Sequence, residues 1–276
     1  MESNCVQYSI SNCSIEKIMN SGQCFRISEI EKGYYLVLSR DLACIASQVG
    51  NATTISCKND DLDYWLSYFD ETSTGGSNLD YCNFEKYGLQ YDNEFIRKSV
   101  EYGVGLRLLN QDPFECLISF IISQRKSIPA IRSSIEKLCQ KYGFKNSYLG
   151  VEYYTFPTLD ALIRGYETDD YADCSLGYRD SYIYETCKAL LGYDLKGVSE
   201  LDYNEALKEL TKFKGVGTKV ANCTLLYSLG FKNAFPRDVW INRILVDFFD
   251  KDYFPYSDFE GVLGLIQLYM FYFARS

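Results

Sequence analysis

The sequence predicts an α+β fold, with a small twisted antiparallel β-sheet domain followed by an all-helical domain. Short apolar and β-branched runs at 34–38, 43–49 and 51–57 are typical of strands. From Asn93 onward, apolar residues recur at helical spacing. No run of about 18 apolar residues occurs, so nothing is expected to span a membrane. We therefore place the sheet domain at residues 1–93 and the helical domain at residues 94–276.

The composition excludes several kinds of chemistry. The chain has 276 residues, is 47% hydrophobic and contains no histidine. This removes histidine bases, Ser-His triads and the commonest zinc ligand. Its 11 cysteines are scattered without a C-x-x-C pair, which argues for reduced thiols and against zinc or an iron–sulfur cluster. We expect no cofactor, and a protein of the cytoplasm (nucleoid-associated in a bacterium) or of a eukaryotic nucleus.

The net charge of −9 argues at first against nucleic acid as a partner, because proteins that bind nucleic acids are usually basic. The basic residues, however, gather in a few short segments. We therefore expect a locally positive cleft on an acidic body, with salt-sensitive binding. The basic residues concerned are Arg125, Lys126, Arg132, Arg179, Lys212, Lys214, Lys219 and Arg237.

The individual elements follow from local signals. The first half should hold a helix at 61–69 and a polar Gly/Ser loop at 72–78. Asp112 before Pro113 is a typical N-cap. It opens a helix that is followed by a polar turn at 123–127, a helix at 128–142 and a short hairpin within 143–154. Further helices are expected after Thr158, at 176–191, at 201–213 and from 256 to 273.

The stretch from Phe213 to Asp238 carries the strongest functional signal. Gly215, Val216 and Gly217 form a tight turn whose amides, with the start of the next helix, suit an anion such as a phosphate. Lys219 lies in the first turn of that helix, where the helix dipole disfavours its charge and favours its use as an amine nucleophile. Without further signals, the same stretch is an ordinary helical hairpin with a surface lysine and a capping aspartate.

The order of these parts resembles the helix-hairpin-helix DNA glycosylases. In that superfamily, a lysine in the second helix of the motif and an aspartate further along form the active site. Lys219 and Asp238 match these two positions.

Residues 21–26, SGQCFR, resemble the G-Q-x-F-R motif of the 8-oxoguanine DNA glycosylase family. The resemblance implies that the Gly22 carbonyl accepts a hydrogen bond from N7–H of the oxidised base, which guanine lacks. It also implies that Gln267 contacts the Watson–Crick edge of the base and that Cys223 and Phe271 lie on its two faces. By residue type alone, Phe271 would be a core residue.

The resemblance also implies four DNA contacts. Gln124 and Arg125 lie in the turn that fills the gap left by the flipped base, and Tyr178–Arg179 match a G-Y-R motif. The chain departs from the family at two positions, since Arg125 replaces the usual first asparagine and Ala130 the usual arginine. We therefore expect relaxed opposite-base specificity.

The implied function is a bifunctional DNA glycosylase with abasic-site lyase activity. It would act as a monomer on double-stranded DNA containing 8-oxoguanine, through a lysine Schiff base. The hairpin would hold a phosphate, with a cation as one option at the backbone of Lys214 and Val216. The alternatives are a glycosylase for another oxidised or ring-opened purine, a non-catalytic DNA-binding module, or a thiol protein in which Cys223 reacts.

Overall fold

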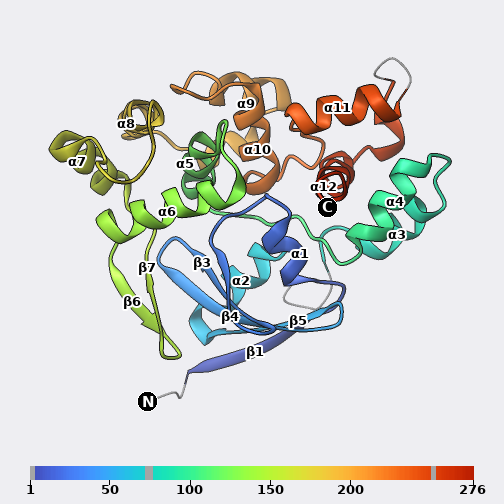
Figure 1. Cartoon of the computed structure of the whole chain (residues 1–276), viewed down its shortest axis with the longest axis horizontal. Coiled ribbons are helices and arrows are strands. Elements are labelled where there is room, and N and C mark those ends of the chain that lie inside the picture. Colours follow the sequence, from blue (N-terminus) through green and yellow to red (C-terminus); the bar gives the residue numbers. More distant parts are fainter. Residues whose placement is uncertain (1–3, 72–76, 250–252) are drawn as a thin grey trace. The chain divides into compact units, whose positions relative to one another are not determined.

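The computed structural model describes residues 4–71, 77–249 and 253–276, drawn in Figure 1. The chain divides into two compact units. The first comprises residues 1–37, 44–110 and 230–276, and the second comprises residues 38–43 and 111–229. The domain boundary expected at residue 93 was drawn from secondary-structure content and remains a prediction.

A five-stranded sheet in the order β1-β5-β4-β3-β2 carries the first part of the chain. β5 pairs antiparallel with β1 and with β4, and β2 pairs antiparallel with β3. Alternate residues of β5 are buried, as expected for a strand with one face against the core. The three predicted strands are confirmed, whereas β1 and β2 were not predicted. The strands are β1 (Cys5–Ile10), β2 (Ile27–Glu31), β3 (Tyr34–Ser39), β4 (Leu42–Val49) and β5 (Ala52–Lys58).

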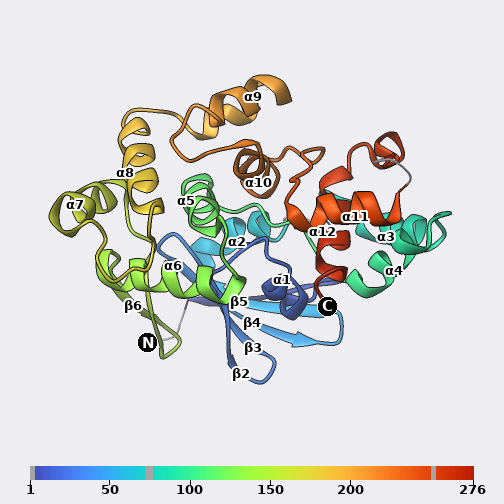
Figure 2. The ribbon, with the colours of Figure 1, turned by 45° about the horizontal axis from the view of Figure 1, so that its top comes forward.

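Helices complete the first unit, and α12 lies at their centre, against α4 and α11 (Figure 2). Tyr269 of α12 is fully buried, and its hydroxyl group bonds to Glu85 and to the carbonyl of Leu106. The helices are α1 (Ile15–Asn20), η1 (Asn59–Asp61), α2 (Leu62–Tyr68), α3 (Tyr81–Leu89), α4 (Glu94–Gly103), α11 (Val239–Phe248), η4 (Tyr256–Phe259) and α12 (Leu263–Phe273).

Two predictions in this unit need comment. The single helix expected from 256 to 273 is wrong, because the chain forms η4 and α12 with Gly261 between them at a φ of +83°. Only glycine adopts that conformation readily. The polar loop predicted at 72–78 falls mostly on residues 72–76, which lie outside the described residues.

The second unit is built around α5, whose residues from Glu115 to Ser123 are all buried. α5 packs against α6, α8 and α10. Asp112 caps it as predicted, with its Oδ1 accepting hydrogen bonds from the amides of Phe114 and Glu115. The elements are α5 (Pro113–Ser123), α6 (Ile128–Tyr142), β6 (Lys145–Tyr148), β7 (Val151–Tyr154), α7 (Leu159–Asp169), α8 (Arg179–Ala189), η2 (Lys196–Glu200), α9 (Tyr203–Leu210) and α10 (Thr218–Ser228).

Candidate active site

The predicted hairpin joins α9 to α10 in the second unit. Gly215 has a φ of +76°, and a Cβ placed on it would come within 2.6 Å of Tyr182 Cγ. Glycine is therefore required there. Gly217 is the N-cap of α10, with a φ of −87° and no side-chain cap, and a Cβ on it would meet nothing within 4 Å. The first amides of α10 thus have no side-chain cap from Gly217, which suits an anion.

Part of the backbone that was predicted as a cation site, at Lys214 and Val216, already makes hydrogen bonds within the second unit. The carbonyl of Lys214 accepts a hydrogen bond of 2.9 Å from Thr186 Oγ1. The amide of Val216 donates to the carbonyl of Phe213 at 3.1 Å. A cation at this place remains a prediction. Among the described residues, no group of three or more acidic, cysteine or histidine side chains could hold a metal ion.

Lys219 is half-buried on the first turn of α10. Its Nζ lies 4.8 Å from the centre of the Phe120 ring, and that ring is stacked on Tyr227. An aromatic face attracts an ammonium group, so Phe120 holds the end of the lysine in a defined place. Cys223 is 2% exposed and lies one turn further along the same helix. The contact between Lys219 and Phe120 could not be predicted from the sequence, because it depends on the packing of α10 against α5.

Asp238 begins α11 in the first unit, as predicted. Its Oδ1 accepts a hydrogen bond of 2.9 Å from the amide of Ile241. Two residues earlier, the carbonyl of Pro236 accepts a hydrogen bond of 3.1 Å from Gln267 Nε2. Gln267 is 3% exposed, and its Oε1 is one of the buried polar atoms that have no hydrogen-bond partner in the described part of the chain. Such an acceptor costs free energy unless a donor reaches it.

Phe271 lies one turn after Gln267 on α12 and is half-buried. The guanidinium of Arg275 lies 5.1 Å from the centre of its ring. Burial lowers the pKa of Arg275, and the carboxylate of Asp238 opposes this change. Arg275 therefore belongs to the surroundings of both Phe271 and Asp238. Sequence reasoning missed it, although its spacing of four residues from Phe271 was a usable signal.

The turn at Gly22 is fixed by its neighbour. Gly22 has a φ of +80°. The side chain of Gln23 is fully buried, donates to the carbonyl of Arg107 at 2.8 Å and accepts from the amide of Leu109 at 2.9 Å. Arg107 and Leu109 lie in the segment that leads to α5, so the hydrogen bonds of Gln23 hold the turn at Gly22 against that segment.

The four predicted DNA contacts differ in exposure. Arg125 is exposed and Tyr178 is 49% exposed. Arg179 is only 7% exposed, and its guanidinium bonds to backbone carbonyls. Gln124 is half-buried, and its side chain donates to the carbonyl of Gly215 at 3.0 Å.

The predicted site residues are thus shared between the two units. The first unit contains Gly22, Asp238, Gln267 and Phe271, and the second contains Gln124, Arg125, Tyr178, Arg179, Gly215, Val216, Gly217, Lys219 and Cys223. In the first unit, Phe271 and Asp238 share Arg275 as a neighbour. In the second unit, Gln124 donates to the carbonyl of Gly215 and its own carbonyl accepts from Arg179.

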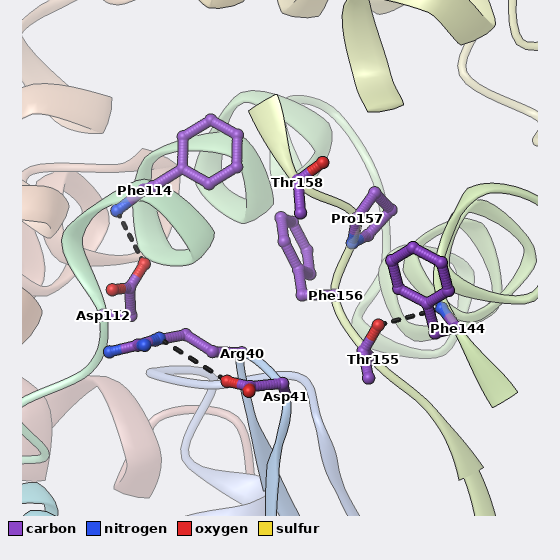
Figure 3. A pocket seen from close by; sticks show the side chains of 9 residues that line it. All are labelled: Arg40, Asp41, Asp112, Phe114, Phe144, Thr155, Phe156, Pro157 and Thr158. Carbon is purple, nitrogen blue, oxygen red and sulfur yellow. Dashed lines mark hydrogen bonds and ion pairs between the residues drawn. The ribbon is translucent and has the colours of Figure 1, made fainter. Parts of the chain in front are cut away.

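A cavity of about 470 Å³ lies in the second unit (Figure 3), and none of the predicted site residues lines it. Three phenylalanine rings form part of its wall, and Arg40 lies near two carboxylates. The residues that line it are Arg40, Asp41, Asp112, Phe114, Phe144, Thr155, Phe156, Pro157 and Thr158. Asp112 and Thr158 also serve as helix caps, so part of their polar capacity is used for the fold.

Two further observations bear on the sequence-based expectations. All 11 cysteines lie in the described part of the chain, and each is a thiol there rather than half of a disulfide. None of the helices in residues 4–71, 77–249 and 253–276 is both long and apolar enough to cross a membrane.

Comparison with known proteins adds independent evidence. The family model described as 8-oxoguanine DNA glycosylase, N-terminal domain, matches residues 5–117. A probable N-glycosylase/DNA lyase from Methanothermobacter thermautotrophicus is 34% identical over 205 residues, which cover 62% of this chain and 64% of that protein. The chain therefore spans less than two thirds of the length of the curated relatives that it matches.

Two solved structures align along nearly their whole length. The structure of MBOgg1 in complex with a low-affinity DNA ligand has a TM-score of 0.89 at 31% identity, over 100% of this chain and 96% of that chain. The second is the Clostridium acetobutylicum 8-oxoguanine glycosylase/lyase in complex with double-stranded DNA containing cytosine opposite 8-oxoG. It has a TM-score of 0.87 at 32% identity, over 99% of this chain and 96% of that chain. Since the likeness extends over the whole of this chain in both sequence and fold, the chain belongs to the 8-oxoguanine DNA glycosylase family.

Proposed function

We propose that this protein excises 8-oxoguanine from duplex DNA and then cleaves the strand at the abasic site. The observation that carries the proposal is Lys219, held half-buried on the first turn of α10 directly after the glycine hairpin. Membership of the family, and the two solved relatives bound to DNA, support the same assignment. The substrate would be double-stranded DNA, and the protein would act as a monomer in the nucleoid or the nucleus.

Recognition of the base rests on the buried acceptor of Gln267. The Watson–Crick edge of 8-oxoguanine carries N–H donors, and Gln267 Oε1 is a buried acceptor without a partner among the described residues. A flipped base would satisfy it, because deaminases and glycosylases read an extruded base through such hydrogen bonds. The Gly22 carbonyl would accept from N7–H, and Cys223 and Phe271 would lie on the two faces of the ring.

The chemistry would proceed through the Lys219 amine. Its lone pair attacks C1′ of the sugar while the bond to N9 breaks, and the electron pair of that bond leaves with the base. The proton lost by the amine neutralises the departing base. Asp238 stabilises the positive charge on the sugar. The C1′–O4′ bond then breaks, O4′ takes a proton from water, and the C1′–N bond becomes a protonated Schiff base. This cation draws electrons during β-elimination: C2′ loses its proton to the hydroxide so formed, the electron pair of that bond forms the C2′=C3′ double bond, and the C3′–O bond breaks with its pair leaving on the phosphate.

No step in this sequence uses a metal or an organic cofactor, and we propose that the enzyme needs none, an iron–sulfur cluster included. The hairpin amides at Gly215–Gly217 would hold a backbone phosphate. Replacement of the usual asparagine by Arg125, and of the usual arginine by Ala130, supports excision opposite more than one partner base.

The test is borohydride trapping on duplexes carrying 8-oxoguanine opposite each of the four bases. We expect a covalent adduct with the wild-type protein, and none with K219Q or with undamaged DNA. Cys139→Ser, a buried position on α6, serves as a control for a buried polar change elsewhere in the second unit. Duplex binding without adduct or strand cleavage would instead identify a non-catalytic DNA-binding module. Adduct formation only on a duplex carrying a ring-opened purine would mean that this lesion, and not 8-oxoguanine, is the substrate.

A further inference from the structure

Arg275 is a neighbour of two predicted site residues of the first unit. Its guanidinium lies 5.1 Å from the centre of the Phe271 ring, and the charge of the Asp238 carboxylate acts on it. Phe271 is predicted to lie on one face of the flipped base, and Asp238 is predicted to stabilise the sugar of the same nucleotide. A cation beside both residues is therefore close to the nucleotide that the site would hold.

The end of α12 puts Arg275 in this place. Ala274, the C-cap of α12, has a helical conformation, and its amide donates to the carbonyl of Met270. The amide of Arg275 donates to the carbonyl of Tyr272 at 3.4 Å. Helical spacing therefore continues past the end of α12, so that Arg275 falls on the same side as Phe271, four residues before it. The negative end of the helix dipole and the face of the aromatic ring both favour a cation there.

The donors of Arg275 are not used inside the protein. Arg275 is exposed, and within the described part of the chain its guanidinium makes no hydrogen bond and no ion pair, not even with Asp238. The other arginine beside Asp238 differs, because Arg237 Nε donates to Asn242 Oδ1 at 2.9 Å. Arg275 thus keeps its whole planar fork of N–H groups for a ligand.

The charge of this part of the site calls for such a cation. The residues predicted for it are Gly22, Asp238, Gln267 and Phe271, and Asp238 is the only one of them with a charged side chain. Its carboxylate would repel the phosphates of the nucleotide that it serves. A guanidinium fork matches the geometry of a phosphate and would offset this repulsion. Since Arg275 forms no ion pair with Asp238, the carboxylate stays available to the sugar.

We propose that Arg275 binds a DNA phosphate that adjoins the flipped nucleotide, and that the Phe271 ring holds the guanidinium for this contact. This inference rests on the proposed function. A phosphate bonded to the flipped sugar comes close to Phe271 and Asp238 only when the nucleotide leaves the base stack. The contact should therefore form with an extrahelical nucleotide and should be missing when undamaged duplex is bound.

The experiment measures how the dissociation constant depends on salt concentration. One duplex contains a non-cleavable abasic analogue, and the other is the same duplex without damage. The analogue keeps the sugar and both adjoining phosphates but has no base, so neither excision nor stacking on Phe271 contributes. The variants are Arg275→Gln and Arg275→Lys, which keeps the charge. Arg164→Gln, at an exposed position of α7, controls for the loss of one positive charge.

We expect Arg275→Gln to bind the abasic duplex roughly tenfold more weakly, the factor for one charge-assisted contact. The slope of the logarithm of affinity against the logarithm of salt concentration should become shallower by about one, because one phosphate contact is lost. Arg275→Lys should keep the slope. On undamaged duplex, and in Arg164→Gln on both duplexes, the slope should stay at the wild-type value. Each Tm should stay within about 2 °C of wild type, since both positions are exposed.

Three results would overturn the inference. An unchanged slope in Arg275→Gln would mean that no phosphate is bound, and an equal change on undamaged duplex would mean that the contact does not need a flipped nucleotide. A slope in Arg275→Lys as shallow as in Arg275→Gln would trace the loss to the ring contact and not to the charge. Failure of the proposed function looks different. In that case the slope would still depend on Arg275 with the abasic duplex, while duplexes carrying 8-oxoguanine would give neither base release nor a trapped adduct.

Discussion

The two hairpin glycines offer a sharp test, because the structure gives them opposite roles. Gly215 has a φ of +76°, and a Cβ on it would lie 2.6 Å from Tyr182 Cγ and 2.8 Å from Tyr182 Cβ. Those two atoms are close to the backbone of α8 and cannot swing away. Gly217 has an ordinary φ, and a Cβ on it would meet nothing within 4 Å.

The magnitudes for alanine at these positions follow directly. At Gly215, the left-handed conformation costs about 1–2 kcal/mol and the steric overlap about 1–3 kcal/mol. The sum of roughly 2–5 kcal/mol corresponds to a fall in Tm of at least about 4 °C for a chain of this size. At Gly217, alanine is a poorer N-cap but loses less entropy on folding, so the net change should stay within about 1 kcal/mol.

The assay is thermal unfolding combined with duplex binding. Gly215→Ala should unfold at a lower temperature. Gly217→Ala should unfold normally but bind duplex DNA more weakly, since its methyl group would stand at the amides offered to a phosphate. Equal stability of the two variants would refute the packing argument. Unchanged binding by Gly217→Ala would refute the phosphate role of the hairpin.

Three further predictions concern other parts of the chain. Gln267→Leu should weaken binding to 8-oxoguanine duplexes without lowering Tm, because it removes a buried acceptor that has no partner in the described residues; equal loss on undamaged DNA would contradict this. Arg107→Met should destabilise the protein by roughly 3–5 kcal/mol in urea unfolding, since it leaves the buried Glu71 carboxylate, 3.0 Å away, without its ion pair; a neutral change would show that the pair is dispensable. The pKa of Asp169 lies below its ordinary value because of hydrogen bonds from Lys141 and a tyrosine. The contribution of the ionised Asp169 to the free energy of unfolding is therefore fully present above the unfolded pKa of 3.8, and it is lost as pH falls through the lower folded pKa. Asp169→Asn should accordingly flatten the acid limb of the curve of Tm against pH.

Local signals predicted the helix starts well. The caps at Asp112, Thr158 and Asp238 all form, because each needs only a side chain and an amide two or three residues away. The hairpin at 145–154 follows for the same reason. Short-range geometry is encoded in short stretches of sequence.

The missed elements have different causes. In β1, Val6, Tyr8 and Ile10 alternate with exposed residues, so the period-two signal of a strand was present in the sequence but was not used. α3 has an N-cap in Asp80, but the helix that follows is only weakly amphipathic. The break at Gly261 follows Ser257, Asp258 and Glu260 and precedes the apolar α12, so the polar residues and the glycine together were an available signal.

The roles within the candidate site depended on contacts that no local pattern contains. Arg179 could be placed on the G-Y-R motif from sequence, but its use was decided by Gln124, 55 residues away. Likewise, the ring that holds Lys219 comes from another helix, α5. The sequence therefore predicted which residues form the site, whereas the contacts that hold them arise from tertiary packing and could not be predicted from it.

The division of these tasks has a consequence for variants. Gln267 and Phe271, which are predicted to contact the base, and Asp238, which is predicted to be catalytic, are held by contacts inside the first unit. Lys219, the predicted nucleophile, and Gln124, in a turn predicted to contact DNA, are held by contacts inside the second unit. A change inside one set should therefore leave the geometry of the other intact. Losses of lesion discrimination and of duplex binding should accordingly be separable, and variants that combine one change from each unit should show additive effects on binding free energy. Strong non-additivity would mean that the two sets constrain each other before DNA is bound.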